Sequence, residues 1–188
     1  MGAAERARAV GLRKALVVAL LVSGCSAPQP ETPAPAFNAT DVMFLQMALA
    51  QVEEGDQVAA LAEDRAGDPA LRTLATELRG QWREESGTME RWLVGWQQPL
   101  EPDPLAGAHA GHGDVHSLRP SDIGELEAAR GKTFDRTAVT LLLGHLGNCV
   151  ETARMETAGG LYPPARTMGE TVTSRRQAQV RTLLKMVA

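Results

Sequence analysis

Three side chains that could hold a transition metal fall at inward positions of predicted helices. His145 and Cys149 are four residues apart, so they share one face of a helix, and both lie within its apolar arc. Glu85 lies inside the apolar stripe of another predicted helix, between Trp82 and Met89. Imidazole, thiol and carboxylate form a mixed set of soft and hard ligands that suits Zn²⁺ or copper. His145, Cys149 and Glu85 are therefore candidate ligands of a mononuclear copper or zinc site, the alternative to the metal-free polar layer that the pattern favours.

The same positions also allow a hydrogen-bonded polar layer without a metal. The two halves of the chain align at a constant offset of 94 residues, which relates His145 to Gln51 and Glu85 to Gln179. Each long helix then has one polar residue on its inner face, at a similar height along the helices. We expect these four side chains to be buried or half-buried, where they either fix the register of the helices or hold a metal. A dinuclear carboxylate site needs several Glu residues and a Glu-x-x-His motif, which the chain lacks.

A second group of histidines lies in a Pro- and Gly-rich segment and consists of His109, His112 and His116. Imidazoles at this spacing could bind a divalent cation weakly, because ordering such a loop costs conformational entropy. The chain has no Ser-His-Asp order, no Gly-rich phosphate loop and no Cys-x-x-Cys motif. These features favour a non-enzymatic protein.

The candidate functional residues are positioned by predicted helices. The sequence predicts four long helices, each with an apolar stripe, and one short helix. Apolar residues recur at three- and four-residue steps, and Gly or Pro interrupts them near residues 67–69, 99 and 159–164. The pattern predicts two repeated αα-hairpins, at about 41–97 and 135–188, joined by a crossover at 98–134. A short helix is expected at about 122–130, with Asp122 as its cap and Glu125 three residues on. Two such hairpins predict an all-α, four-helix bundle.

The composition agrees with helices and excludes several classes of protein. Only 4% of the 188 residues are aromatic while 44% are hydrophobic, so an all-β sandwich or barrel is not expected. The formal net charge is −4, and no basic patch suggests binding to nucleic acid.

The first 36 residues predict export and a lipid anchor. Residues 1–24 combine a cationic start, a short apolar run and small residues before Cys25, as in a lipoprotein signal peptide. Cys25 is the predicted lipidation site, carrying acyl chains such as palmitate, and residues 25–36 form a Pro-rich linker. An ordinary signal peptide with a chance Cys is the alternative. The predicted mature chain carries a net charge of −7 and is tethered to the lipid bilayer, on the extracytoplasmic face of a cell membrane.

Several short stretches resemble a known bacterial family, the domain of unknown function 305, over residues 37–188. The matching positions are 37–44, Met47, 68–71, 74–75, Glu85, Met89, 92–93, 134–136 and 153–154. The resemblance implies a ferritin-like helical bundle with a His-His pair in the first helix of each hairpin, and metal binding. Here those pairs fall on Gln51-Val52 and His145-Leu146, so the resemblance implies a degenerate metal site.

The sequence leads to two main functional hypotheses and to a third, weaker one. The first is a lipid-anchored extracytoplasmic protein with a non-enzymatic binding or accessory role, whose protein partner the sequence does not identify. The second is an extracytoplasmic protein that binds copper or zinc through His145, Cys149 and Glu85 or through the loop histidines. The third is a redox or hydrolytic enzyme on the same scaffold.

Overall fold

The computed structural model describes residues 36–101 and 118–187 of the chain. Within these residues the chain forms five helices and no strands, so the all-helical prediction is confirmed. The helices are α1 (Ala39–Arg65), α2 (Pro69–Gly95), α3 (Pro120–Ala128), α4 (Gly131–Gly159) and α5 (Pro163–Val187). The predicted signal peptide, Cys25, nearly all of the linker and the three loop histidines lie outside the described residues. None of the described helices has the length and hydropathy needed to cross a membrane.

The helices α1 and α2 begin after residues whose side chains suit a helix start. Asn38 caps α1 through a capping box with Asp41, and Asp68 caps α2 directly before Pro69. The predicted cap of α3 was wrong, because the helix begins at Pro120 rather than at Asp122. Asp122 is the third residue of the helix, in its first turn, where its carboxylate accepts the backbone N–H of Arg119 at 3.0 Å. Proline suits the first turn because it has no N–H to leave unpaired.

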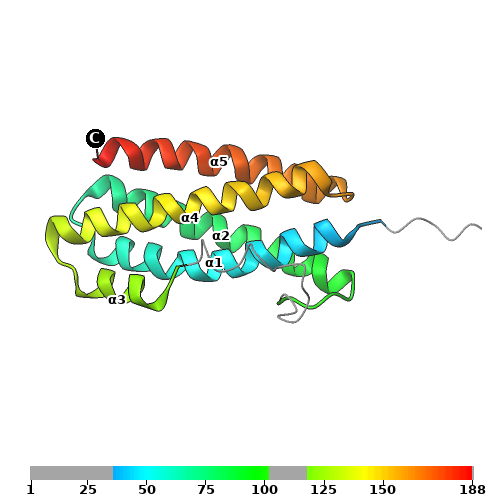
Figure 1. Ribbon diagram of the computed structural model, residues 1–188, viewed down its shortest axis with the longest axis horizontal. Coiled ribbons are helices and arrows are strands. Elements are labelled where there is room, and N and C mark those ends of the chain that lie inside the picture. The colour runs from blue at the N-terminus through cyan, green and yellow to red at the C-terminus, as the bar shows by residue number, and fades with distance from the viewer. Residues whose placement is uncertain (1–35, 102–117, 188) are drawn as a thin grey trace, which may run out of the picture. The chain divides into compact units, whose positions relative to one another are not determined.

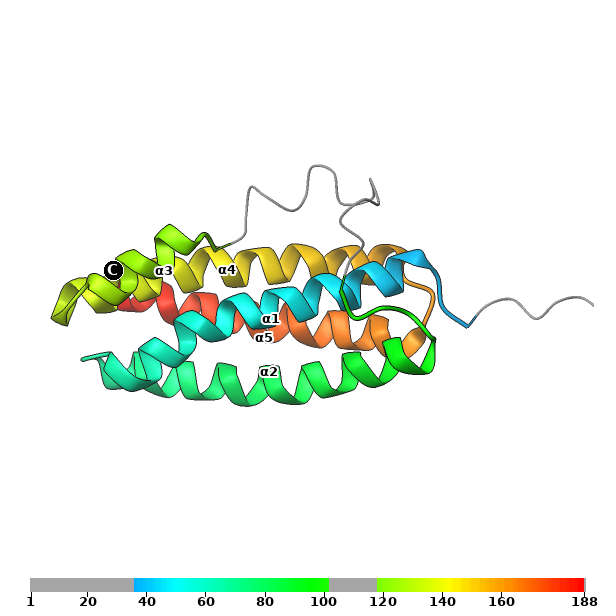
Figure 2. The ribbon, with the colours of Figure 1, turned by 90° about the horizontal axis from the view of Figure 1, so that it is seen from below.

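The four long helices lie side by side as two hairpins (Figures 1 and 2). α1 packs on α2, α4 packs on α5, and α1 against α4 joins the two pairs. The short α3 lies against α4 and α1. α1 and α4 therefore each contact three other helices of the described residues.

The interior has two apolar clusters with polar groups between them. One cluster surrounds Trp82 and Leu146, and the other contains Phe44, Met89 and Ala153. On α1, α2 and α5 the positions predicted for the polar layer fall between residues of the first cluster and residues of the second, whereas His145 on α4 lies within the first cluster, between Leu142 and Leu146. The apolar burial on both sides fixes the height at which these polar side chains meet.

Each hairpin also holds the turn of the other through an aspartate. Asp41, at the start of α1, accepts the backbone N–H groups of Leu161 at 3.1 Å and Tyr162 at 2.9 Å in the α4–α5 turn. Asp135, at the start of α4, accepts those of Gly67 at 2.9 Å and Asp68 at 3.1 Å in the α1–α2 turn. All three pairs of matching positions differ by 94 residues. The two halves of the chain therefore share these contacts between aspartate and turn as well as their sequence pattern.

Candidate functional site

The centre of the interior holds a buried histidine–cysteine pair on α4. His145 is 2% exposed and Cys149 is 7% exposed, and their Nε2 and Sγ atoms are 3.6 Å apart. One helical turn separates the two residues, which places the side chains one above the other. The edge of the Trp82 ring meets the His145 ring with 5.8 Å between centroids. Gly55 on α1 leaves the room for both rings, because a Cβ there would clash with each of them.

Burial keeps both members of this pair uncharged at neutral pH. Desolvation lowers the pKa of His145 to about 4, with a further lowering from the Arg176 charge, against a hydrogen bond to the Gln51 backbone. Desolvation raises the pKa of the Cys149 thiol to about 12, although Arg176 opposes the rise. The pair is therefore a neutral thiol and a neutral imidazole, which cannot act as a thiolate nucleophile.

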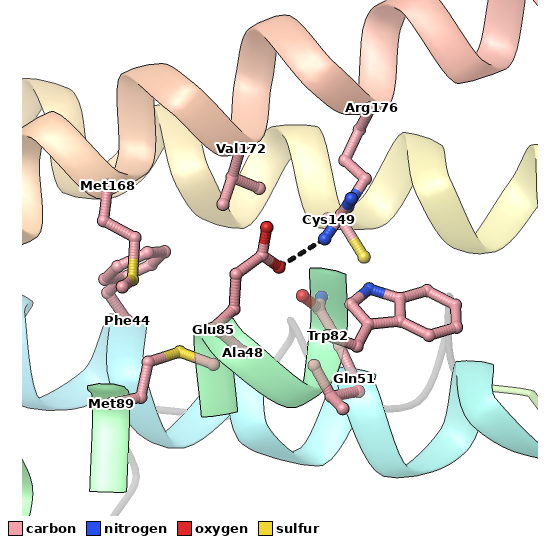
Figure 3. A pocket seen from close by; sticks show the side chains of 11 residues that line it. Phe44, Ala48, Gln51, Trp82, Glu85, Met89, Cys149, Met168, Val172 and Arg176 are labelled. Carbon is pink, nitrogen blue, oxygen red and sulfur yellow. Dashed lines mark hydrogen bonds and ion pairs between the residues drawn. The ribbon is translucent and has the colours of Figure 1, made fainter. Parts of the chain in front are cut away.

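Glu85 is held by arginines of α5 instead of by His145. It forms an ion pair with Arg176 through one carboxylate oxygen (Figure 3). Arg175 lies 3.5 Å from the other oxygen. Arg176 is only 1% exposed, which is rare for an arginine unless it is paired. Desolvation raises the pKa of Glu85 against the lowering effect of both arginines, and it lowers the pKa of Arg176. The ion pair is thus the charged centre of the layer.

Two glutamines complete the network around Arg176. The guanidinium donates to the side-chain oxygen of Gln81 at 2.7 Å and to that of Gln179 at 3.2 Å. Gln179 in turn donates to Gln81 at 3.0 Å. This network joins α2 to α5 across the interior, and both terminal nitrogens of the guanidinium bind side chains of the protein.

Glu85, His145 and Gln179 are buried and Gln51 is half-buried, and the four side chains belong to three separate groups. Glu85 and Gln179 meet through Arg176, His145 meets Cys149, and Gln51 donates to the Thr152 hydroxyl at 2.9 Å. The sequence prediction missed three partners, namely Arg176, Gln81 and Thr152. The repeat offset contained a signal for Arg176, since it places this residue on the same stripe position as Trp82.

The residues present fit a three-ligand metal site poorly. Among the described residues, no three His, Cys, Asp or Glu side chains gather as metal ligands, and the Glu85 carboxylate is engaged by a guanidinium. The adjoining cavity is about 20 Å³, room for a single water molecule, and Met89 and Met168 are in its lining (Figure 3). Only His145 and Cys149 keep a suitable spacing, because tetrahedral zinc bonds of about 2.3 Å to sulfur and 2.0–2.1 Å to nitrogen put the two ligand atoms about 3.5 Å apart.

Comparison with known proteins agrees with the helical architecture. The sequence model described as Domain of unknown function (DUF305) matches residues 41–187. No curated protein matches the chain in sequence. Among solved structures, a DUF305 protein of Streptomyces coelicolor, described as secreted, superposes with a TM-score of 0.72 at 16% identity, over 78% of this chain and 91% of that one.

Two further solved structures have the same fold. A DUF305 fragment from Deinococcus radiodurans superposes with a TM-score of 0.68 at 21% identity, covering 81% of this chain and 97% of that one. CopM in its Cu(II)-bound form gives a TM-score of 0.65 at 21% identity, covering 78% and 94%, and CopM has also been solved with Cu(I) and with silver. At these identities the likeness shows a shared fold.

Proposed function

Because the chain belongs to the DUF305 family, we propose that it is a non-catalytic binding or accessory protein on the extracytoplasmic face of a cell membrane. In this proposal Cys25 carries the acyl chains, the linker of residues 25–36 is the tether, and residues 37–188 form a ferritin-like four-helix bundle of two hairpins. One observation carries the non-catalytic role. The buried layer is occupied by the Glu85–Arg176 network, in which the guanidinium binds the Glu85 carboxylate and the side-chain oxygens of Gln81 and Gln179.

A guanidinium in this position disfavours a resident metal in the layer. Arg176 supplies the positive charge that Glu85 needs, so the carboxylate does not require a metal as counter-ion. It also lies close enough to lower the pKa values of both His145 and Cys149. A metal cation bound to this pair would have to overcome repulsion from Arg176 in a medium of low dielectric constant. These charges favour a degenerate family site.

The export features support the place proposed for the protein. Val22-Ser23-Gly24-Cys25 is similar to the lipoprotein signal motif, and a relative of the same fold is described as secreted. Fully extended, the eleven residues between Cys25 and Phe37 reach about 36–40 Å, so the domain could lie well clear of the headgroups. The net charge of −7 for the predicted mature chain would keep it off an anionic lipid surface.

Copper or zinc handling is the second candidate, and a specific observation favours it. The 3.6 Å separation of His145 Nε2 and Cys149 Sγ is close to that of two ligands on one tetrahedral metal. CopM, which shares the fold, has been solved with copper and with silver. Thiol and imidazole are ligands for Cu(I) and Zn²⁺. In this candidate function the metal would be held by His145 and Cys149, with the loop histidines as a separate weak site.

Metal titration of the full chain separates the two candidates. Cu(I), Ag(I) and Zn²⁺ would each be added in the presence of a competing chelator, and bound metal measured after gel filtration. The useful variant is His145→Gln, because glutamine is the residue at the matching position 51 of the first half. We expect less than one equivalent of metal per chain, and the same amount in this variant.

One equivalent of metal that disappears in His145→Gln and in Cys149→Ser would overturn the first proposal in favour of the second. Metal that disappears only when His109, His112 and His116 are replaced together would assign binding to the loop. For the anchor, Cys25→Ala should abolish incorporation of labelled palmitate and release the protein from the membrane fraction. Retention of that variant in the membrane would contradict the proposed lipid anchor.

A further inference from the structure

A second buried acidic group lies where the start of α1 meets the α4–α5 turn. Asp41 and Glu156 are both 0% exposed, although they come from different hairpins. The Asp41 carboxylate accepts the backbone N–H groups of Asn38 at 2.6 Å, Leu161 at 3.1 Å and Tyr162 at 2.9 Å. Three N–H donors favour the ionised form of this carboxyl.

Glu156 has a different environment. No N–H or O–H donor of the described residues reaches either of its oxygens. Its carboxyl lies against Gly160 while the Asp41 carboxylate binds the N–H of the next residue, Leu161, so the two buried carboxyls are neighbours. Two ionised carboxylates have no hydrogen to share, so this contact requires one proton. Since Asp41 already accepts three N–H groups, the proton belongs on Glu156, which donates it to Asp41. Gly160 provides the space for this arrangement, because a Cβ at that position would clash with the Glu156 carboxyl.

We propose that Asp41 and Glu156 share one proton, and that this carboxyl pair is a pH-sensitive clasp which holds the α4–α5 turn to the start of α1 and loosens when the proton is lost in alkaline medium. The clasp is distinct from the polar layer around Arg176 and does not depend on the function proposed above. Without the proton, two buried negative charges would face each other, and Glu156 would turn towards solvent. The turn residues Leu161 and Tyr162 would then lose their firm contact with α1.

The charges facing Glu156 from the helices packed against it give the direction of the pH effect. Desolvation raises the pKa of Glu156 to about 8 and the Asp41 carboxylate on α1 raises it further, while Arg166 on α5 opposes the rise. An acid whose pKa is raised by folding stabilises the folded state most when it is protonated. Its contribution is therefore complete below its ordinary pKa of 4.5 and is lost as the pH rises to about 8.

The other half of the molecule contains a natural control. Asp135 holds the α1–α2 turn through the matching pair of N–H bonds, yet the position matching Glu156 is Ala62. An alanine has no proton to lose. The proposal therefore applies to one of the two turns, and the contact made by Asp135 should not respond to alkaline pH in this way.

Urea unfolding of the full chain between pH 5 and 9 tests the clasp. The variant Glu156→Gln keeps a donor for Asp41 but cannot ionise. We expect the unfolding constant of the wild type, relative to that of the variant, to rise by up to tenfold per pH unit between about 5 and 8, and then to level off. Parallel pH profiles for the two proteins would overturn the proposal.

A direct measurement on the wild type keeps the test decisive if Glu156→Gln does not fold. Carbon-13 labelling of the glutamate carboxyls should show one resonance that titrates near pH 8, well apart from the others. That resonance should be absent from Glu156→Ala, the variant that copies Ala62 of the first half. If every glutamate carboxyl of the wild type is ionised by about pH 6, the shared proton does not exist.

Discussion

At the scale of single residues, the most informative side chain is Arg176. It is almost fully buried, its guanidinium lies 5.6 Å from the centre of the Trp82 ring, and it pairs with Glu85. Burying two charges costs several kcal/mol for each ion, and their attraction offsets this only when the geometry is good. The pair is therefore better regarded as fixing which face of α2 meets α5 than as a source of stability. Replacement of either Glu85 or Arg176 alone should strongly lower the free energy of unfolding.

Replacement of Arg176 should destabilise the fold strongly. Arg176→Met leaves the Glu85 carboxylate buried without its partner, and breaking a buried pair in this way typically costs about 3–5 kcal/mol. The matched control is Arg175→Met, because Arg175 is 46% exposed and 3.5 Å from the same carboxylate. Its loss should cost less than about 1 kcal/mol. The free energy of unfolding in urea measures both. Equal effects would show that the buried pair has no special role.

The Cys149 thiol should be unreactive in the folded protein. It is buried, and its pKa of about 12 keeps it protonated at every ordinary pH. In the full chain carrying Cys25→Ala, Cys149 is the single thiol, so a chromogenic disulfide reagent reports on it alone. At pH 8 the folded protein should react on the order of 100-fold more slowly than the protein in urea. Fast labelling without urea would mean that the interior opens readily.

At the scale of helices, the close approach of α1 to α4 depends on Gly55. The His145 and Trp82 rings fill the space next to this residue, and an added Cβ would lie 2.7 Å from the Trp82 ring. The matching position in the second half is Cys149, so the repeat places a small residue here in both hairpins. A glycine normally weakens a helix interior, and here the packing of two rings accounts for its presence.

Two glycine-to-alanine substitutions should therefore have opposite effects. Gly55→Ala forces the rings of His145 and Trp82 to move, and overpacking of this kind costs about 1–3 kcal/mol. Gly80→Ala, on α2, adds a methyl group that meets nothing within 4 Å, so it should stabilise the fold by about 0.5–1 kcal/mol through helix propensity. The melting temperature of each variant, compared with that of the wild type, shows whether the substitution stabilises or destabilises the fold. A stable Gly55→Ala protein would contradict the tight packing of α1 on α4.

The sequence predicted the helices better than it predicted the partners of their polar side chains. The apolar stripes and the breakers at Pro69 and Pro163 indicate where α2 and α5 begin, because proline and periodicity act locally. A helical wheel also identifies the inward face on which Glu85 and His145 lie. It does not say which side chain reaches across from another helix, and a long arginine from α5 takes the place expected for a metal. Such pairings depend on distances of a few ångströms between helices.

At the scale of the whole domain, the two hairpins are tied by a pair of equivalent contacts. Asp41 and Asp135 each hold the turn of the opposite hairpin through two backbone N–H groups. Neither hairpin therefore satisfies these backbone N–H groups of its turn by itself, because the aspartate that accepts them belongs to the other hairpin. This exchange explains how two halves of low sequence identity keep the same 94-residue spacing of Asp, turn and proline. Asp41 also accepts the N–H of Asn38 and is fully buried, so it should contribute more to stability than Asp135.

Substitution of either aspartate should weaken the domain near pH 7, and substitution of Asp41 should weaken it more. Asp135→Asn replaces a charged acceptor of two N–H groups by a neutral one, and Asp41→Asn does the same to an acceptor of three. Each loss should be about 1–3 kcal/mol in the free energy of unfolding, with the larger loss for Asp41. Asp64→Asn is the control for the change in net charge, since Asp64 is an exposed residue near the end of α1. It should alter the free energy by less than about 0.5 kcal/mol.

The loss of stability at acidic pH should depend on Asp41. Burial alone would raise its pKa, but the N–H groups of Asn38, Tyr162 and Leu161 and the Glu156 carboxyl together lower it below 3.8. An acid whose pKa is lowered by folding stabilises the folded state above its ordinary pKa, and this contribution is lost as the pH falls through the folded value. The difference in unfolding free energy between wild type and Asp41→Asn should therefore shrink below about pH 4. A difference that stays constant down to pH 2 would mean that Asp41 is not ionised in the fold.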